Sequence, residues 1–152
     1  MFDARRAPVR RLPAGEFTGM LALLFATVAF SIDAMLPALP AIAAELSPGA
    51  VNNAQLVLSA FVLGMGLGTL FVGPISDAAG RKVTVAGGAV LYVAGSLLAL
   101  YARQLEFLLL ARLLQGVGAS APRVAGMALV RDLYAGREMA RIMSFVMMVF
   151  MV

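Results

Sequence analysis

The sequence predicts an all-α protein that crosses a membrane several times. Of its 152 residues, 62% are hydrophobic and 13% are charged, whereas a typical soluble domain carries about 25% charged residues. The apolar residues gather in runs of about 20, the length at which an α-helix crosses the hydrocarbon core of a bilayer. Ten of the 12 basic residues lie outside these runs, in the N-terminal tail or between the runs. We therefore expect four transmembrane helices and the start of a fifth.

The first two helices are expected at residues 17–36 and 53–72, after an N-terminal tail at 1–16. Serine, proline and glycine at positions 47–49 break the chain between the two helices. A cleaved signal peptide is the alternative for the beginning of the chain, because a basic tail precedes an apolar run. That run is longer than the usual 7–15 residues of a signal peptide and contains Asp33, which favours a transmembrane helix.

The third and fourth helices are expected at residues 83–102 and 107–130, and a fifth is expected from 142 to 152. About ten residues are too few to cross a bilayer. We therefore expect the chain to be a piece of a longer protein, with 17–152 forming part of its N-terminal transmembrane domain.

The distribution of lysine and arginine predicts the orientation. The tail and the second and fourth connections hold nine basic residues, whereas the first connection holds none and the third holds only Arg103. The nine are Arg5, Arg6, Arg10, Arg11, Arg81, Lys82, Arg131, Arg137 and Arg141. Because connections rich in lysine and arginine stay in the cytoplasm, we expect the tail and the even-numbered connections to lie there.

Composition also argues against several kinds of function. The sequence has no cysteine and no histidine, so thiolate metal sites, disulfides and histidine general bases are excluded. No serine has a visible partner base, so an enzyme is not expected. The net charge is +4, but the basic residues flank apolar runs instead of forming one stripe, which argues against nucleic-acid binding.

Two charged residues are expected inside the membrane. Asp33 lies in the first apolar run and Arg112 in the fourth, and such residues by default face the bundle interior or a water-filled cavity. A rise of 1.5 Å per residue places both at similar depth, where an acid and a base can compensate each other, directly or through water. Asp33 is therefore a candidate proton acceptor. The alternatives are an interfacial Asp33, if the helix ends near Pro37, and an Arg112 that snorkels outward.

The fourth helix has a stripe of polar and small residues. Its members follow the helical spacing i, i+3, i+4, i+7 and i+11: Arg112, Gln115, Gly116, Ala119 and Arg123. Such a stripe is typical of a cavity lining or a tightly packed surface and not of lipid contact. Arg123 lies nearer the inner boundary, where snorkelling is the alternative. Glycines in the second and third helices, including the GxxxG pair Gly64 and Gly68, are expected to allow close helix approach.

The segment 73–82 reads GPISDAAGRK. It resembles the signature loop between helices 2 and 3 of the major facilitator superfamily, Gly-x-Leu-x-Asp-Arg-x-Gly-Arg-Lys/Arg. Five positions match, namely Gly73, Asp77, Gly80, Arg81 and Lys82. Ile75 is a conservative change, and Ala78 stands where the family usually has a basic residue.

Two further segments support the resemblance. Residues 112–119, RLLQGVGA, are similar to the Arg-x-x-Gln-Gly-x-Gly-Ala signature of proton-coupled members. Residues 31–40, SIDAMLPALP, resemble the first helix of the bicyclomycin-resistance (Bcr/CflA) branch of the drug:proton antiporters. The three motifs occur in the family's order. The resemblance covers nearly the whole chain but only about the first third of a twelve-helix member.

The resemblance implies the N-terminal helical bundle of a transporter in the bacterial inner membrane. The implied activity is export of drugs or small amphipathic compounds, driven by the proton gradient and without a cofactor or metal. The implied partners are the lipid bilayer, the small-molecule substrate, protons and the C-terminal half of the transporter. Two alternatives stay open: a metabolite or sugar exporter on the same scaffold, and a membrane fragment or interaction protein that does not transport.

The resemblance also implies roles for single residues. Asp77 and Arg81 would belong to a cytoplasmic charge cluster that holds one conformation, with Asp132 as a partner for Arg81. Arg112 would influence the protonation of Asp33. The alternative is that the signature loop only keeps this side of the protein in the cytoplasm. That accounts for Arg81 and Lys82 but not for Asp77 or Gly80.

Overall fold

The structure is a computed structural model that describes residues 14–134 and 136–151. Within them it contains the helices α1 (Ala14–Asp33), α2 (Leu39–Leu46), α3 (Leu56–Ala79), α4 (Arg81–Leu100), α5 (Leu105–Leu133) and α6 (Gly136–Met151). Two short 3-10 helices, η1 (Leu36–Ala38) and η2 (Val51–Gln55), lie in the first connection. No strand occurs in these residues, so the predicted all-α class is confirmed.

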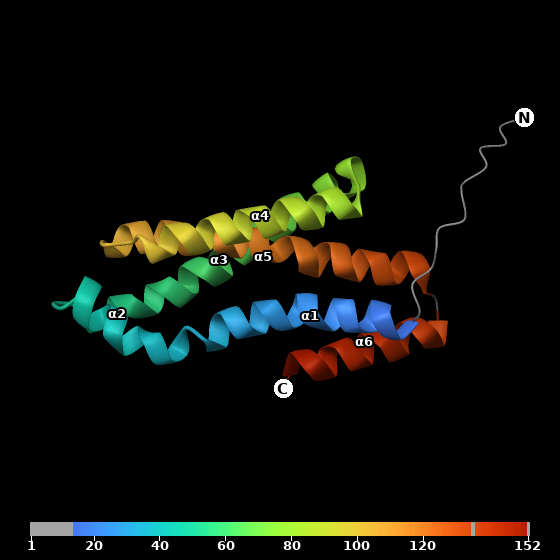
Figure 1. Cartoon of the computed structure of the whole chain (residues 1–152), viewed down its shortest axis with the longest axis horizontal. Coiled ribbons are helices and arrows are strands. Elements are labelled where there is room, and N and C mark those ends of the chain that lie inside the picture. The colour runs from blue at the N-terminus through green and yellow to red at the C-terminus, as the bar shows by residue number, and fades with distance from the viewer. Residues whose placement is uncertain (1–13, 135, 152) are drawn as a thin grey trace, which may run out of the picture.

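The long helices lie side by side along one axis, as Figure 1 shows. α5 packs along both α3 and α4, and α1 packs on α6 and α5. The α3–α4 connection and the starts of α1 and α6 gather at the end of the bundle where α5 finishes. α2 and the start of α5 lie at the opposite end. α5 is therefore the central helix, and the chain alternates between the two ends.

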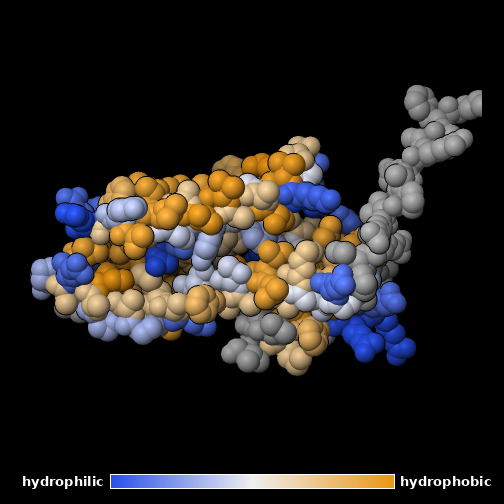
Figure 2. All heavy atoms as spheres, viewed as in Figure 1, coloured by the Kyte–Doolittle hydropathy of each residue, from blue (hydrophilic) through white to orange (hydrophobic). Residues whose placement is uncertain are grey.

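Three segments among the described residues are long and apolar enough to cross a membrane: Gly15–Leu46, Asn52–Ala79 and Arg81–Leu100. Large apolar side chains such as Leu70 and Val90 point outward from them and are about 70% exposed. On the face shown in Figure 2, hydrophobic residues cover most of the sides of the bundle, and hydrophilic residues gather toward its ends. These features are those of a multi-pass membrane protein.

The connection between α3 and α4 differs from the expected loop at 73–82. α3 continues to Ala79 and α4 begins at Arg81, so a single residue, Gly80, separates them. Gly80 has a φ of +91°, a conformation that residues with a side chain rarely adopt. The prediction of a polar loop was wrong because the length of an apolar run reports the bilayer crossing, whereas a helix continues into polar sequence beyond it.

Two other helix ends also differ from the predictions. α1 ends at Asp33 instead of residue 36, just before the 3-10 helix that contains Pro37. α6 begins at Gly136 and not near residue 142, because its first turn is charged and polar and therefore invisible to a search for apolar runs. The other predicted ends agree within a few residues, and the tail at 1–13 lies outside the described residues.

Glycines allow α5 to approach the backbone of α3. A Cβ atom added to Gly64 would overlap the carbonyl group of Leu113, and one added to Gly116 would overlap the carbonyl oxygen of Phe61. Gly68 also lies close to α5, because an added Cβ would approach the Val117 carbonyl oxygen to 2.9 Å. The predicted GxxxG pair therefore lies in a helix interface.

Glycines also allow α5 to approach the backbone of α4. A Cβ on Gly88 would lie 2.8 Å from the carbonyl oxygen of Gly118, and one on Gly95 would lie 2.9 Å from that of Ala111. These separations are shorter than van der Waals contact, so neither position tolerates a side chain without movement of a helix. The backbone of α5 is thus in contact with neighbours on two sides.

A third interface joins α1 to the ends of α5 and α6. It consists of buried apolar side chains: Phe17, Leu21, Phe25, Val130, Ile142 and Val146. The rings of Phe17 and Tyr134 add a tilted contact with centroids 5.5 Å apart. Gly126 of α5 lies against this cluster, where an added Cβ would lie 3.0 Å from Cδ2 of Leu21. Because large side chains of α1 fill this interface, α1 packs less closely on α5 than α3 and α4 do.

The glycine contacts lead to a test of stability. We expect Gly116→Ala to destabilise the protein by about 1–3 kcal/mol, because the new methyl group collides with the backbone of α3. Gly66→Ala is the matched control: it lies on α3 with no atom near its Cβ position, and alanine there should stabilise the helix by up to about 1 kcal/mol. Thermal unfolding in detergent measures both, and equal melting temperatures for the two variants would contradict the packing argument.

Candidate functional site

The guanidinium group of Arg112 lies inside the bundle with few acceptors around it. Its Nη1 donates to Oε1 of Gln115 at 2.9 Å, and its Nη2 contacts the sulfur of Met35 at 2.6 Å. Its Nε is buried and has no hydrogen-bond partner among the described residues. A thioether is a weak acceptor, so this cation is only partly satisfied by the groups around it.

The network continues from Arg112 into α4. Nε2 of Gln115 donates to Oγ of Ser96 at 2.8 Å, and that hydroxyl donates to the carbonyl oxygen of Tyr92 at 2.9 Å. The Tyr92 hydroxyl is in turn hydrogen-bonded to Oγ of Ser31 on α1. This interior network therefore links α5, α4 and α1. It contacts α1 at Ser31 and the turn that follows α1 at Met35.

Asp33 is not part of the interior network. It is the last residue of α1 and is exposed, and the ion pairs among the described residues involve neither Asp33 nor Arg112. The predicted direct compensation between Asp33 and Arg112 is therefore absent. The chain leaves the helix after Asp33, and the resulting turn directs Met35, which is 6% exposed, toward Arg112.

The stripe on the fourth predicted helix consists of residues with different surroundings. Gln115 is buried in the network, whereas Gly116 contacts α3 and Ala119 packs against Val28 and Phe61. Gly116 and Ala119 thus lie in tightly packed surroundings, one of the two expected possibilities. Arg123, the last member of the stripe, is exposed.

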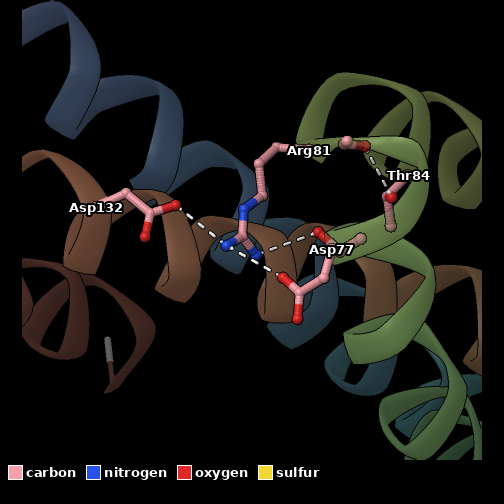
Figure 3. A network of polar contacts seen from close by, with 6 residues as sticks. Asp77, Arg81, Thr84 and Asp132 are labelled. Carbon is pink, nitrogen blue, oxygen red and sulfur yellow. Dashed lines mark hydrogen bonds and ion pairs between the residues drawn. The ribbon is translucent and has the colours of Figure 1, made fainter.

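A second polar cluster lies where α3 and α4 meet, as Figure 3 shows. The Nη2 atom of Arg81 lies 3.1 Å from Oδ2 of Asp132 and 3.4 Å from Oδ1 of Asp77, and its Nη1 donates to Oγ of Ser76 at 3.2 Å. The predicted pair of Arg81 with Asp132 is therefore formed. Arg81 joins the ends of α3, α4 and α5. We call these four residues, Ser76, Asp77, Arg81 and Asp132, the Arg81 cluster.

The remaining residues of the signature segment shape this end of the bundle. The carbonyl oxygen of Gly80 accepts hydrogen bonds from both the backbone nitrogen and Oγ1 of Thr84, at 3.1 and 3.0 Å. Lys82 is exposed, and Gly73 lies within α3 with no atom near its Cβ position. These contacts begin α4 directly after the turn and place Arg81 at its first position.

Several residues of the two clusters were not predicted as site residues. Tyr92 and Ser96 were missed, although polar residues four apart on an apolar helix indicate one polar face. Ser76 was missed because it stands at a variable position of the signature; it is only 1% exposed. Nothing in the sequence indicated that Met35 contacts an arginine, since methionine usually fills apolar space.

Comparison with known proteins agrees with this architecture. The profile of the Major Facilitator Superfamily matches residues 21–152. The chain is 39% identical over 139 residues to an uncharacterized MFS-type transporter, YdgK, of Bacillus subtilis, which covers 91% of this chain and 34% of the relative. It is 40% identical over 107 residues to a chloramphenicol resistance protein of Pseudomonas aeruginosa, covering 70% of this chain and 25% of the relative.

A further relative is the multidrug resistance protein MdtL of Citrobacter koseri, which is 36% identical over 115 residues, with 74% of this chain and 29% of the relative covered. The aligned region thus spans between a quarter and about a third of the length of these relatives. Because the family profile covers nearly all of the helical bundle, this chain belongs to the Major Facilitator Superfamily.

Proposed function

We propose that the chain is the N-terminal part of a secondary transporter that exports drugs or small amphipathic compounds in exchange for protons. Relatives named as chloramphenicol and multidrug resistance proteins support the cargo class. The motif at residues 31–40 supports the bicyclomycin-resistance (Bcr/CflA) type. The distribution of arginine and lysine supports an inner-membrane protein with a cytoplasmic N-terminus.

The observation that carries proton coupling is the partly satisfied guanidinium of Arg112. A buried cation without a full set of acceptors is costly, and a carboxylate is the acceptor that best matches a guanidinium. Asp33 stands two residues before Met35, which already contacts Arg112. We infer that Asp33 pairs with Arg112 in another state of the transport cycle and that protonation of Asp33 ends this pairing.

The Arg81 cluster supports a role in alternating access. Arg81 binds residues of two other helices, so relative movement of α3, α4 and α5 at this end must break its contacts. The Asp77 side chain is 73% exposed and has a single ion-pair contact at 3.4 Å. Asp77 therefore has an oxygen free for a helix of the C-terminal half, and we propose that the cluster stabilises the state in which the cytoplasmic side is closed.

The first test is efflux of a fluorescent cationic dye from cells that express the complete transporter containing this chain. We expect efflux that stops on addition of a protonophore, because the proton gradient supplies the energy. Absence of efflux across a varied panel of compounds, with the protein confirmed in the membrane, would contradict drug export and favour a metabolite exporter or a protein that does not transport.

A substitution at Asp33 tests the proton acceptor. We expect Asp33→Asn in the complete transporter to lower protonophore-sensitive efflux by about tenfold or more, since an amide cannot exchange the proton. Asp33→Glu is the matched control and should retain part of the efflux. Membrane insertion, measured by immunoblotting of membrane fractions, should be unchanged in both. Undiminished efflux by Asp33→Asn would assign proton coupling to another residue.

A double-mutant cycle tests the Arg81 cluster. We expect Arg81→Ala and Asp132→Ala to be coupled by about 0.2–1 kcal/mol in detergent unfolding, as is usual for partly exposed ion pairs, with the coupling weakening at high salt. Lys82→Ala with Asp132→Ala is the control pair, because Lys82 is adjacent to Arg81 in sequence but forms no ion pair with the residues that the structure describes. Equal coupling in the two pairs would show that only general charge attraction acts here.

A further inference from the structure

Ser96 has a fixed hydrogen-bonding direction within the interior network. A serine hydroxyl has one proton to donate, and Ser96 donates it to the carbonyl oxygen of Tyr92, four residues earlier on α4, at 2.9 Å. Its oxygen is then available only as an acceptor. The group that it accepts from is Nε2 of Gln115, at 2.8 Å.

This direction determines how the Gln115 amide is turned. Because Nε2 must face the Ser96 oxygen, Oε1 faces the other way, toward Nη1 of Arg112 at 2.9 Å. The reverse orientation would place the amide NH2 against the guanidinium, donor against donor, and would leave both without an acceptor. Gln115 is 5% exposed, so water has little access to replace a lost partner.

We propose that Ser96 is a positioning residue that acts on Arg112 through Gln115. By fixing the Gln115 amide, Ser96 keeps Nη1 of Arg112 engaged and leaves the buried Nε without a partner among the described groups. Nε and Nη2 form one of the edges at which a guanidinium binds a carboxylate in a bidentate manner. Nη2 contacts the Met35 sulfur, a weak acceptor that a carboxylate can replace. Ser96 therefore determines which edge of the Arg112 guanidinium stays available to a carboxylate during transport. The transport part of this inference rests on the proposed function.

The interior network also connects Ser96, Gln115 and Arg112 to α1. Tyr92, whose carbonyl oxygen fixes the Ser96 hydroxyl, is hydrogen-bonded through its own hydroxyl to Ser31, and Arg112 contacts Met35. Movement of α1 relative to α4 and α5 must therefore change contacts at both ends of the network. Ser96 lies between them and holds the orientation of Gln115 while α1 moves.

The test measures the position of Arg112 directly. In the complete, detergent-solubilised transporter, Arg112 is modified with phenylglyoxal, and the rate is measured at this residue by peptide mass spectrometry. We expect Ser96→Ala to raise the rate about fivefold, the effect of losing one ordinary hydrogen bond that holds the group. Ser96→Thr keeps the hydroxyl and should restore the native rate. In transporting cells, Ser96→Ala should also change the pH dependence of efflux, and Ser96→Thr should not.

Ser120→Ala is the matched control. Ser120 is also a buried serine whose hydroxyl donates to a carbonyl of its own helix, that of Val117 at 2.7 Å, but it is hydrogen-bonded to neither Gln115 nor Arg112. In the Ser120→Ala variant we expect the rate of phenylglyoxal modification at Arg112 and the pH dependence of efflux to equal those of the native protein. If this control raises the rate as much as Ser96→Ala does, the effect is general loosening and the proposal is wrong.

The outcomes separate this inference from the proposed function. An unchanged rate at Arg112 in Ser96→Ala overturns the positioning role, whatever the transport activity. A raised rate, with no protonophore-sensitive efflux from any version including the native one, supports the positioning role and contradicts the proposed function. A raised rate with active efflux of unchanged pH dependence contradicts the role of Ser96 in coupling.

Discussion

The close approach of α5 to α3 and α4 is the constraint on which the rest of the structure depends. Glycines on both sides of each interface remove the side chains that would otherwise separate the helices. Within a bilayer apolar side chains gain little by leaving lipid, so this backbone contact is a principal source of stability. It makes α5 the central helix even though it carries Arg112 and Arg123 and is less apolar than its neighbours.

The interior network follows from that packing. Since α5 is held against α4, the side chains of Gln115 and Ser96 meet directly. Since α1 packs less closely, there is room for the longer side chains of Arg112, Met35 and Tyr92 between the helices. The arginine therefore has neighbours that hold it without neutralising it, as the proposed change of its partner requires.

The Arg81 cluster depends on the same arrangement at the end of the bundle. A one-residue connection at Gly80 places Arg81 at the start of α4, directly beside the last turn of α3. The end of α5 supplies Asp132 from the other side, as Figure 3 shows. A longer loop would let this arginine move away from both carboxylates, so the short turn and the ion pairs belong together.

The sequence by itself determined the class of the fold, the order and approximate place of the helices, and the family motifs. It did so because bilayer thickness imposes a length on apolar runs, and because glycine, aspartate and arginine at fixed spacing identify the signature segment. It also predicted the pair of Arg81 with Asp132, through the family resemblance.

Only the tertiary structure decided which polar groups meet. The sequence predicts how deep a residue lies along a helix. It does not predict how the helix is rotated about its own axis or at which residue it ends. Depth alone therefore suggested that Asp33 and Arg112 compensate each other, directly or through water. In the structure the end of α1 at Asp33 turns Met35 toward Arg112 instead. The roles of Tyr92, Ser96 and Ser76 likewise depend on contacts between helices, which hydropathy and motif spacing do not record.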